Sequence, residues 1–258
     1  MRKWFVLALL LCLSSGSVYA KVVTQTVDYK DGDTVLEGYL AYDDSIPGKR
    51  PGILVVHEWN GLGHYVQGRA EQLAKLGYVA FAADIYGKGV RPDTMEACKT
   101  ESSKYYADRK LLRRRVNLGL DQLKNNALVD PAKIAAIGYC FGGSTVLELG
   151  RSGADIAGIV SFHGGLDNPN PADAKNIKAK VLVCQGGADQ WTLPALPAFK
   201  KEMDDAKVDY KVIVYKGAVH GFTNPDNKGV VPGLKYDAKA DKASWKAMKE
   251  FFDKIFKS

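Results

Sequence analysis

The chain has 258 residues, of which 46% are hydrophobic and 25% are charged, and this is enough to bury the core of one large domain. It contains no internal repeat, low-complexity tract or long linker, which excludes repeat and compositionally biased proteins. The formal net charge is +7, but the excess is diffuse and does not favour nucleic-acid binding.

The first 20 residues have the layout of a secretory signal peptide. Arg2 and Lys3 form a basic start, the run from Trp4 to Leu13 is apolar, and Ala20 ends a small-residue processing site. The run is shorter than the roughly 20 residues of a membrane-spanning helix. We expect residues 1–20 to be removed, leaving an exported protein, periplasmic or secreted, with no integral membrane segment. The alternative is a buried N-terminal helix.

The remaining residues, 21–258, alternate between strand-like and helix-like segments. Residues 22–29 and 34–42 alternate in polarity as a hairpin does, with a turn at 31–33. Continuous apolar runs follow, which are typical of central strands that are covered on both faces. These runs are residues 52–58, 78–84, 133–139, 156–163, 179–186 and 210–217.

Helical spacing separates several of these strands. Residues 66–74 share one apolar face, and Gly77 is placed to end that helix. In the helix over 112–123, the arginines at 113–115 are expected to form a solvated face. The apolar stripe over 245–255 is expected to pack in the core. This pattern predicts a single α/β domain, with a mostly parallel sheet and helices on both faces. Ligands bind beyond the carboxyl ends of the strands in such sheets.

A cysteine follows one predicted strand in the segment GYCFGG. Gly138, Cys140 and Gly142 form G-x-C-x-G, the thiol counterpart of the G-x-S-x-G turn. The flanking glycines remove Cβ atoms that would clash in a sharp strand-to-helix turn. A helix beginning after Cys140 would favour its thiolate. The alternative is a small cysteine packed after a strand.

Two other strand ends carry the groups that a thiol nucleophile needs. Asp189 follows the strand at 179–186, and His220 follows the strand at 210–217. The chain order Cys140, Asp189, His220 matches the nucleophile, acid, histidine order of α/β-hydrolases. In this hypothesis Cys140 attacks a carbonyl carbon, His220 transfers protons and Asp189 orients the imidazole.

The oxyanion of such a reaction needs two N–H donors. One is expected from the residue after the nucleophile, Phe141. The second is expected from the loop that follows the strand at 52–58.

Five motifs in this order resemble the dienelactone hydrolase family of α/β-hydrolases: HEWNGL, ADIYGKG, GYCFGG, GGADQW and AVHGF. The resemblance covers nearly all of residues 25–256, and it implies an α/β-hydrolase fold. It also implies that Glu58 interacts with the nucleophilic thiol and helps control its ionisation, and that the N–H of Trp59 is the second oxyanion donor. The alternative for Glu58 is a structural pair at a strand end.

The resemblance also locates the substrate contacts, and here the sequence departs from the family. Lys88 and Asn224 stand where the family has arginines that hold a substrate carboxylate. Lysine keeps the charge without the two-pronged geometry, and asparagine loses the charge. Tyr86 and Trp191 are further expected substrate contacts. We therefore expect a broader ester or lactone substrate than a dienelactone.

The other cysteines and histidines leave several questions open. Cys184 is expected to be a buried thiol, and Cys98 could pair with it only if the fold brings the two together. His163 is expected to be structural or to line the pocket, and His57 and His64 could also line it. No Cys/His spacing resembles a metal site. The segment after Asp84 could cap the site.

The sequence thus predicts a hydrolase that cleaves a small-molecule carboxylic ester or lactone through an acyl-cysteine intermediate, without metal or organic cofactor. Two kinds of alternative remain. One is a thioesterase, peptidase or acyltransferase on the same scaffold. The other is a binding or stress-response protein without turnover. The sequence does not determine the oligomeric state.

Overall fold

The computed structural model describes residues 21–257. The predicted signal peptide, residues 1–20, lies outside them. The described part has eight strands, six α-helices and two short 3-10 helices, Pro171–Asn176 and Leu193–Ala195. The strands are β1 (Val22–Asp31), β2 (Thr34–Asp43), β3 (Arg50–Val56), β4 (Val79–Ala83), β5 (Val129–Tyr139), β6 (Gly158–Phe162), β7 (Lys180–Gly186) and β8 (Tyr210–Tyr215). The α-helices are α1 (His64–Lys75), α2 (Met95–Ala107), α3 (Arg109–Lys124), α4 (Phe141–Arg151), α5 (Leu196–Asp205) and α6 (Ala238–Ile255).

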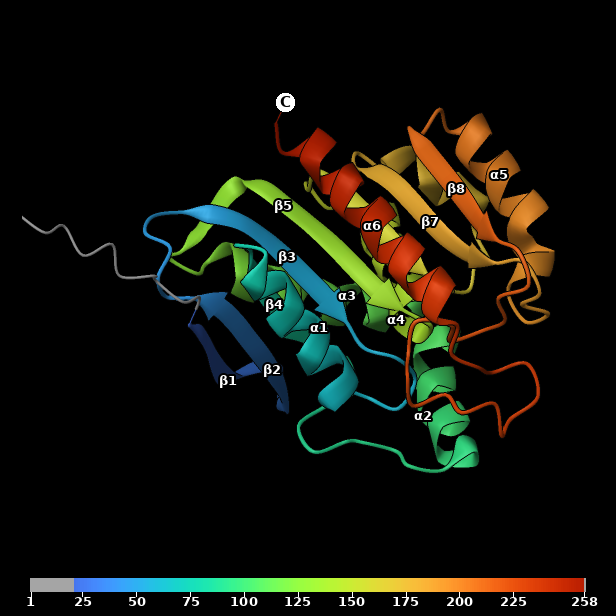
Figure 1. Ribbon diagram of the computed structural model, residues 1–258, viewed down its shortest axis with the longest axis horizontal. Coiled ribbons are helices and arrows are strands. Elements are labelled where there is room, and N and C mark those ends of the chain that lie inside the picture. Colours follow the sequence, from blue (N-terminus) through green and yellow to red (C-terminus); the bar gives the residue numbers. More distant parts are fainter. Residues whose placement is uncertain (1–20, 258) are drawn as a thin grey trace, which may run out of the picture.

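All eight strands form one sheet in the order β1-β2-β4-β3-β5-β6-β7-β8. The predicted hairpin is confirmed, because β1 and β2 pair antiparallel along their whole length and β2 then pairs antiparallel with β4. The other six strands, β3 to β8, are parallel to one another. Figure 1 shows this sheet with helices in front of it and behind it. The predicted α/β-hydrolase fold class is therefore confirmed.

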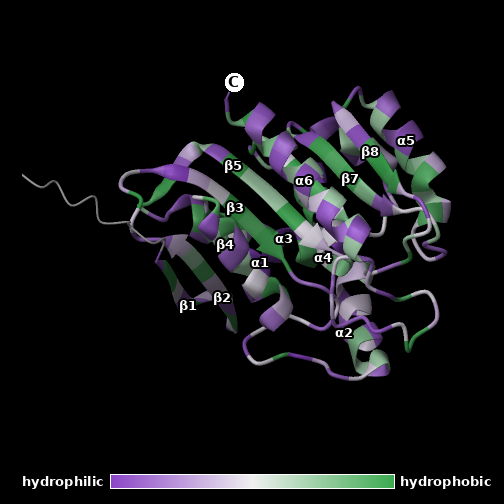
Figure 2. Ribbon diagram, in the orientation of Figure 1, coloured by the Kyte–Doolittle hydropathy of each residue, from purple (hydrophilic) through white to green (hydrophobic). Residues whose placement is uncertain are grey.

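Two hydrophobic layers hold the helices to the sheet. On one face, α1 and α6 bury residues such as Leu73, Met248 and Phe252 against the strands. On the other face, α3, α4 and α5 contribute residues such as Leu120 and Leu147, among others. In Figure 2, β7 is largely hydrophobic while α6 alternates between hydrophobic and hydrophilic residues along its length. A helix with one apolar stripe packs in this way on a sheet that is apolar on both faces.

Two expectations about burial are wrong. The strand at 210–217 is not central, because β8 is the last strand of the sheet, and Val214 is 47% exposed. The arginines of α3 do not form a solvated face throughout. Arg115 is buried and pairs with Asp31 at 2.5 Å, and Arg113 pairs with Glu148 at 2.8 Å. Helical spacing gives the direction of a side chain, but it does not reveal a carboxylate brought near by another element.

The turn at Cys140 requires glycine on both sides. Cys140 has φ +53° and ψ −113°, a conformation that non-glycine residues rarely adopt. A Cβ atom at Gly138 would overlap the carbonyl oxygen of Gly142, and one at Gly142 would overlap the carbonyl oxygen of Val56. The glycines thus let the backbone turn directly from β5 into α4, with the Cys140 side chain at the carboxyl edge of the sheet.

Replacing Gly138 by alanine is expected to destabilise the protein by at least about 3 kcal/mol, because the new methyl group would overlap backbone that cannot move aside. Gly68→Ala is the matched control. Gly68 lies inside α1 and, beyond the backbone of its own helix, nothing lies within 4 Å of its potential Cβ, so this change should stabilise by about 0.5–1 kcal/mol. Urea unfolding of both variants tests the argument, and equal stabilities would contradict it.

Candidate active site

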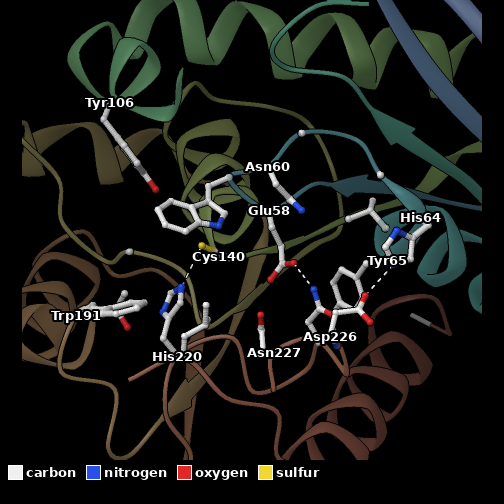
Figure 3. Close-up of a pocket in the computed structure, with 18 of the residues that line it drawn as sticks. Glu58, Asn60, His64, Tyr65, Tyr106, Cys140, Trp191, His220, Asp226 and Asn227 are labelled. Carbon is white, nitrogen blue, oxygen red and sulfur yellow. Dashed lines mark hydrogen bonds and ion pairs between the residues drawn. The ribbon is translucent and has the colours of Figure 1, made fainter. Parts of the chain in front are cut away.

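The three residues of the predicted triad lie in one hydrogen-bonded chain at the carboxyl edge of the sheet. The Cys140 Sγ lies 3.0 Å from Nε2 of His220, and Nδ1 of His220 lies 2.9 Å from Oδ2 of Asp189. Figure 3 shows the Cys140 thiol and the His220 ring facing each other. The three residues follow β5, β7 and β8, whose parallel ends bring distant parts of the chain together.

Asp189 is fixed by groups of its own loop. Its Oδ1 accepts hydrogen bonds from the N–H groups of Trp191 (3.0 Å) and Thr192 (3.2 Å), and its Oδ2 accepts the Thr192 hydroxyl (2.7 Å). Burial alone would raise the pKa of Asp189, but the hydrogen bonds from His220 and Thr192 outweigh it and lower the pKa. The carboxylate is therefore ionised and cannot rotate freely.

His220 is held in its charged form by its two neighbours. Burial lowers its pKa, but the negative charges of Cys140 and Asp189 and the hydrogen bonds to them outweigh burial and raise the pKa to about 10. The imidazolium can then donate from Nδ1 to Asp189 and from Nε2 to the Cys140 sulfur. This arrangement is typical of an activated cysteine nucleophile.

A cavity of about 470 Å³ opens in front of the thiol. Cys140 itself lines it and is partly exposed, so the sulfur is accessible to a solute. Residues from the loops after β3, β6, β7 and β8 line the cavity, and Tyr106 of α2 contributes to one wall. The segment after Asp84 thus borders the site through Tyr106.

The predicted oxyanion donors belong to two segments, the start of α4 and the loop after β3. Phe141 is the first residue of α4, where a helix leaves backbone N–H groups without intrahelical partners. Trp59 follows Glu58 in the loop after β3 and lines the cavity. The hydroxyl of Tyr86 donates to the Trp59 carbonyl oxygen at 3.0 Å. Tyr86 is buried and does not line the cavity, so it supports the loop, and its contact with substrate stays a prediction.

His57 also holds the loop after β3 that contains Glu58 and Trp59. Burial lowers its pKa to about 4, so the ring is neutral. Its Nε2 accepts the N–H of Ile85 at 3.2 Å, so Nδ1 carries the proton and donates to the Glu58 carbonyl oxygen at 2.6 Å. His57 is fully buried and does not line the cavity, whereas His64 does line it.

Glu58 is buried and lines the cavity, but its hydrogen bond goes to a residue other than the thiol. The Asn224 side-chain amide donates to Glu58 Oε2 at 2.6 Å, while the thiol contacts His220 (Figure 3). Burial raises the pKa of Glu58, and the Asn224 hydrogen bond opposes this shift. Asn224 was expected to touch substrate; it does line the cavity, yet its first partner is Glu58.

Lys88 is not at the site. It does not line the cavity, and its ammonium pairs with Asp28 at 2.6 Å and with Glu37 at 3.4 Å. The contact of Lys88 with substrate stays a prediction that its position does not support. Trp191 does line the cavity, and its ring centroid lies 5.0 Å from that of His220. The sequence alone could not separate these cases, because both residues follow a strand end.

His163 has a contact with the nucleophile that the sequence did not reveal. Its Nδ1 accepts the backbone N–H of Cys140 at 3.2 Å, and its Nε2 lies 2.7 Å from the Thr223 hydroxyl. Burial lowers its pKa well below the usual value, so the ring is neutral and can accept this bond. His163 thus helps to hold the strained turn at Cys140. Its position after β6, between Cys140 and Asp189 in the chain, was the only signal.

The three cysteines of the described residues are free, so Cys98 and Cys184 do not pair. Cys184 is fully buried in β7, as expected. No described helix has the length and apolar character needed to cross a membrane. Within residues 21–257, no group of three His, Cys, Asp or Glu side chains is arranged to hold a metal ion.

Comparison with known proteins identifies relatives along most of the chain. A model of the dienelactone hydrolase family matches residues 36–256. A Bradyrhizobium sp. protein named probable 2-oxo-3-(5-oxofuran-2-ylidene)propanoate lactonase is 28% identical over 215 residues, which cover 78% of this chain and 86% of its own.

Two solved structures have a TM-score of 0.88 to this chain. The protein called m3DLH is 38% identical, and the match covers 91% of this chain and 98% of its own. A dienelactone hydrolase-like promiscuous phosphotriesterase from metagenomic libraries is 40% identical, with coverage of 92% and 99%.

Proposed function

The chain belongs to the dienelactone hydrolase family and is a carboxylic ester hydrolase, and we propose that it acts through an acyl-cysteine intermediate on Cys140. The substrate is a small-molecule ester or lactone. The observation that supports this mechanism best is the hydrogen-bonded chain from the Cys140 thiol through His220 to Asp189, which opens on a cavity.

In the proposed acylation, the Cys140 sulfur attacks the carbonyl carbon and the carbonyl oxygen becomes an oxyanion. The N–H groups of Phe141 and Trp59 stabilise this charge. The intermediate collapses as its carbon–oxygen bond breaks, and the leaving alkoxide takes the proton on Nε2 of His220. The product alcohol departs and an acyl thioester remains on Cys140. With a lactone, the alcohol stays attached to the acyl group.

Deacylation uses the same groups in the reverse roles. His220, now neutral, removes a proton from a water molecule, and the hydroxide attacks the thioester carbon. The second oxyanion collapses, the carbon–sulfur bond breaks, and Cys140 leaves as a thiolate beside the imidazolium. Asp189 stabilises the charged ring in both steps. Glu58, beside the attacking thiol in the cavity, is proposed to modulate its ionisation through its charge.

We further propose that the protein is exported. The basic start, apolar run and small-residue site of residues 1–20 support a cleaved signal peptide. Mass spectrometry of the protein from its native cells would test this, because export predicts a mature N-terminus at Lys21.

The same scaffold could instead transfer an acyl group from a thioester or peptide, or pass it to an acceptor other than water. A substrate panel separates these reactions from ester hydrolysis. The purified protein should hydrolyse activated esters or lactones faster than matched thioesters and peptides, and intact mass should show one acyl group on Cys140 during turnover. A phosphotriester belongs in the panel because one solved relative is described as a promiscuous phosphotriesterase. Absence of both turnover and acylation would leave a non-catalytic binding protein.

A further inference from the structure

We propose that the active-site cavity selects for uncharged acyl groups and discriminates against substrates with a free carboxylate. This inference rests on the proposed function, because it concerns the substrate of the same site. It is carried by the charges that line the cavity and by the partners of those charges.

The cavity wall contains carboxylates without neighbouring free cations. Glu58, Asp167 and Asp226 line it, and none of the described lining residues is a lysine or an arginine. A carboxylate that leaves water for such a cavity gains no charge partner, and an unpaired buried charge is strongly disfavoured.

The basic groups in and beside the cavity wall already have partners. His220 lies between the Cys140 sulfur at 3.0 Å and Asp189 at 2.9 Å. Nε2 of His64 lies 2.8 Å from Oδ2 of Asp226, an interaction that Figure 3 marks with a dashed line. The Arg109 guanidinium pairs with Asp167 at 3.0 Å and packs over the Tyr106 ring. The Nε and Nη1 atoms of Arg109 are shielded from solvent and have no hydrogen-bond partner in the described chain. Arg109 is not among the residues that line the cavity.

Glu58 offers no charge partner to an anionic substrate in either protonation state. When ionised, it repels a second carboxylate in the cavity. When protonated, the form that burial favours by raising its pKa, it is neutral. In neither state does Glu58 supply the positive charge that a substrate carboxylate needs.

The remaining walls suit an uncharged group. Trp59, Tyr65, Tyr106 and Trp191 line the cavity, and Figure 3 shows Tyr106 and Trp191 on one side of Cys140 and Tyr65 on the other. Aromatic faces bind apolar or aromatic groups through area burial and offset stacking. The Bradyrhizobium relative is named for a propanoate, which is anionic, so this chain is expected to prefer a different substrate from the one in that name.

The test uses two 4-nitrophenyl esters that differ by one negative charge and one methyl group, 4-nitrophenyl adipate and its methyl ester. The methyl ester is expected to have a kcat/KM at least about 100-fold higher, which corresponds to about 2.8 kcal/mol. Equal values, or a preference for the free acid, would overturn the inference while leaving the proposed function intact, provided that turnover depends on Cys140. Absence of turnover with both esters would overturn the proposed function, and the inference with it.

Two variants show where the selection arises. Asn224→Arg places a guanidinium beside Glu58, so the preference for the neutral ester should fall at least about tenfold, whether the new cation meets the substrate or neutralises Glu58. Lys88→Ala is the matched control, because Lys88 lies outside the cavity, and it should leave the preference unchanged. If the preference for the neutral ester changed only in the Lys88 variant, the substrate carboxylate would be recognised at Lys88 and not in the cavity. That result would overturn the proposal.

Discussion

Cys140→Ala is expected to lower kcat/KM for an ester substrate by about 10⁴-fold or more while the protein stays folded. The loss is large because alanine has no nucleophile, and His220 alone can only assist water. The fold should survive because the thiol is partly exposed and alanine can adopt the same backbone angles as cysteine. Steady-state kinetics and circular dichroism of the same sample measure both effects.

The Cys140→Ser variant provides the comparison within the same turn. A hydroxyl is a much weaker acid than a thiol, so serine must be activated by His220 during the attack and cannot start as an anion. We expect its activity to lie between those of the native protein and Cys140→Ala. Removal of the thiol should also lower the pKa of His220, because Cys140 is the largest contribution that raises it. Full activity in the alanine variant would contradict the mechanism.

The sequence was sufficient to predict the parallel sheet and the convergence of Cys140, Asp189 and His220 at its carboxyl edge. Continuous apolar runs define buried parallel strands, and catalytic groups then follow from strand ends. Cys140, Asp189 and His220 each stand directly after such a run. The need for glycine around Cys140 could also be predicted from the sequence. Only a residue without Cβ at position 138 avoids an overlap with the backbone of Gly142.

Contacts between loops could not be predicted in the same way. The amide of Asn224 meets Glu58 because two loops far apart in the chain converge, and no local pattern encodes this. The bond from the Cys140 N–H to His163 arises likewise, from neighbouring strands β5 and β6. Lys88 is the opposite case. The family resemblance placed it at the substrate site, but its ammonium pairs with Asp28 and Glu37 of the β1–β2 hairpin.

Position in the sheet was the other quantity that the sequence did not reveal. The run at 210–217 is as apolar as a central strand, although β8 is an edge. Its place at the edge follows from strand order, which periodicity does not determine. This matters for the site, because His220 follows that edge strand and is held by the loop after it. The His220 N–H donates to the Gly233 carbonyl oxygen at 3.0 Å, and Lys235 donates its N–H to the His220 carbonyl oxygen at 3.2 Å.

Asp189→Asn is expected to reduce kcat by about 10²- to 10⁴-fold with little change in fold, since the equivalent exchange in a Ser-His-Asp triad costs about 10⁴-fold. The amide keeps the shape of the carboxylate, and its oxygen can still accept the N–H groups of Trp191 and Thr192. Its NH₂ group would then face Nδ1 of His220. A neutral imidazole would accept a hydrogen bond from this NH₂ group at Nδ1 and carry its own proton on Nε2. Nε2 could then no longer take a proton from the Cys140 thiol.

The pH dependence of Cys140 alkylation distinguishes this effect from a general loss of structure. The negative charge of Asp189 helps to raise the pKa of His220, so the amide should lower that pKa and weaken the pairing of imidazolium with thiolate. Alkylation by iodoacetamide should therefore require a higher pH in Asp189→Asn than in the native protein. Asp209→Asn is the matched control, because Asp209 is exposed and pairs with Lys180 at 3.3 Å. The Asp209→Asn variant should keep the native alkylation profile, because Asp209 lies away from the imidazole. A native profile in Asp189→Asn as well would show that Asp189 does not act on Cys140 through His220.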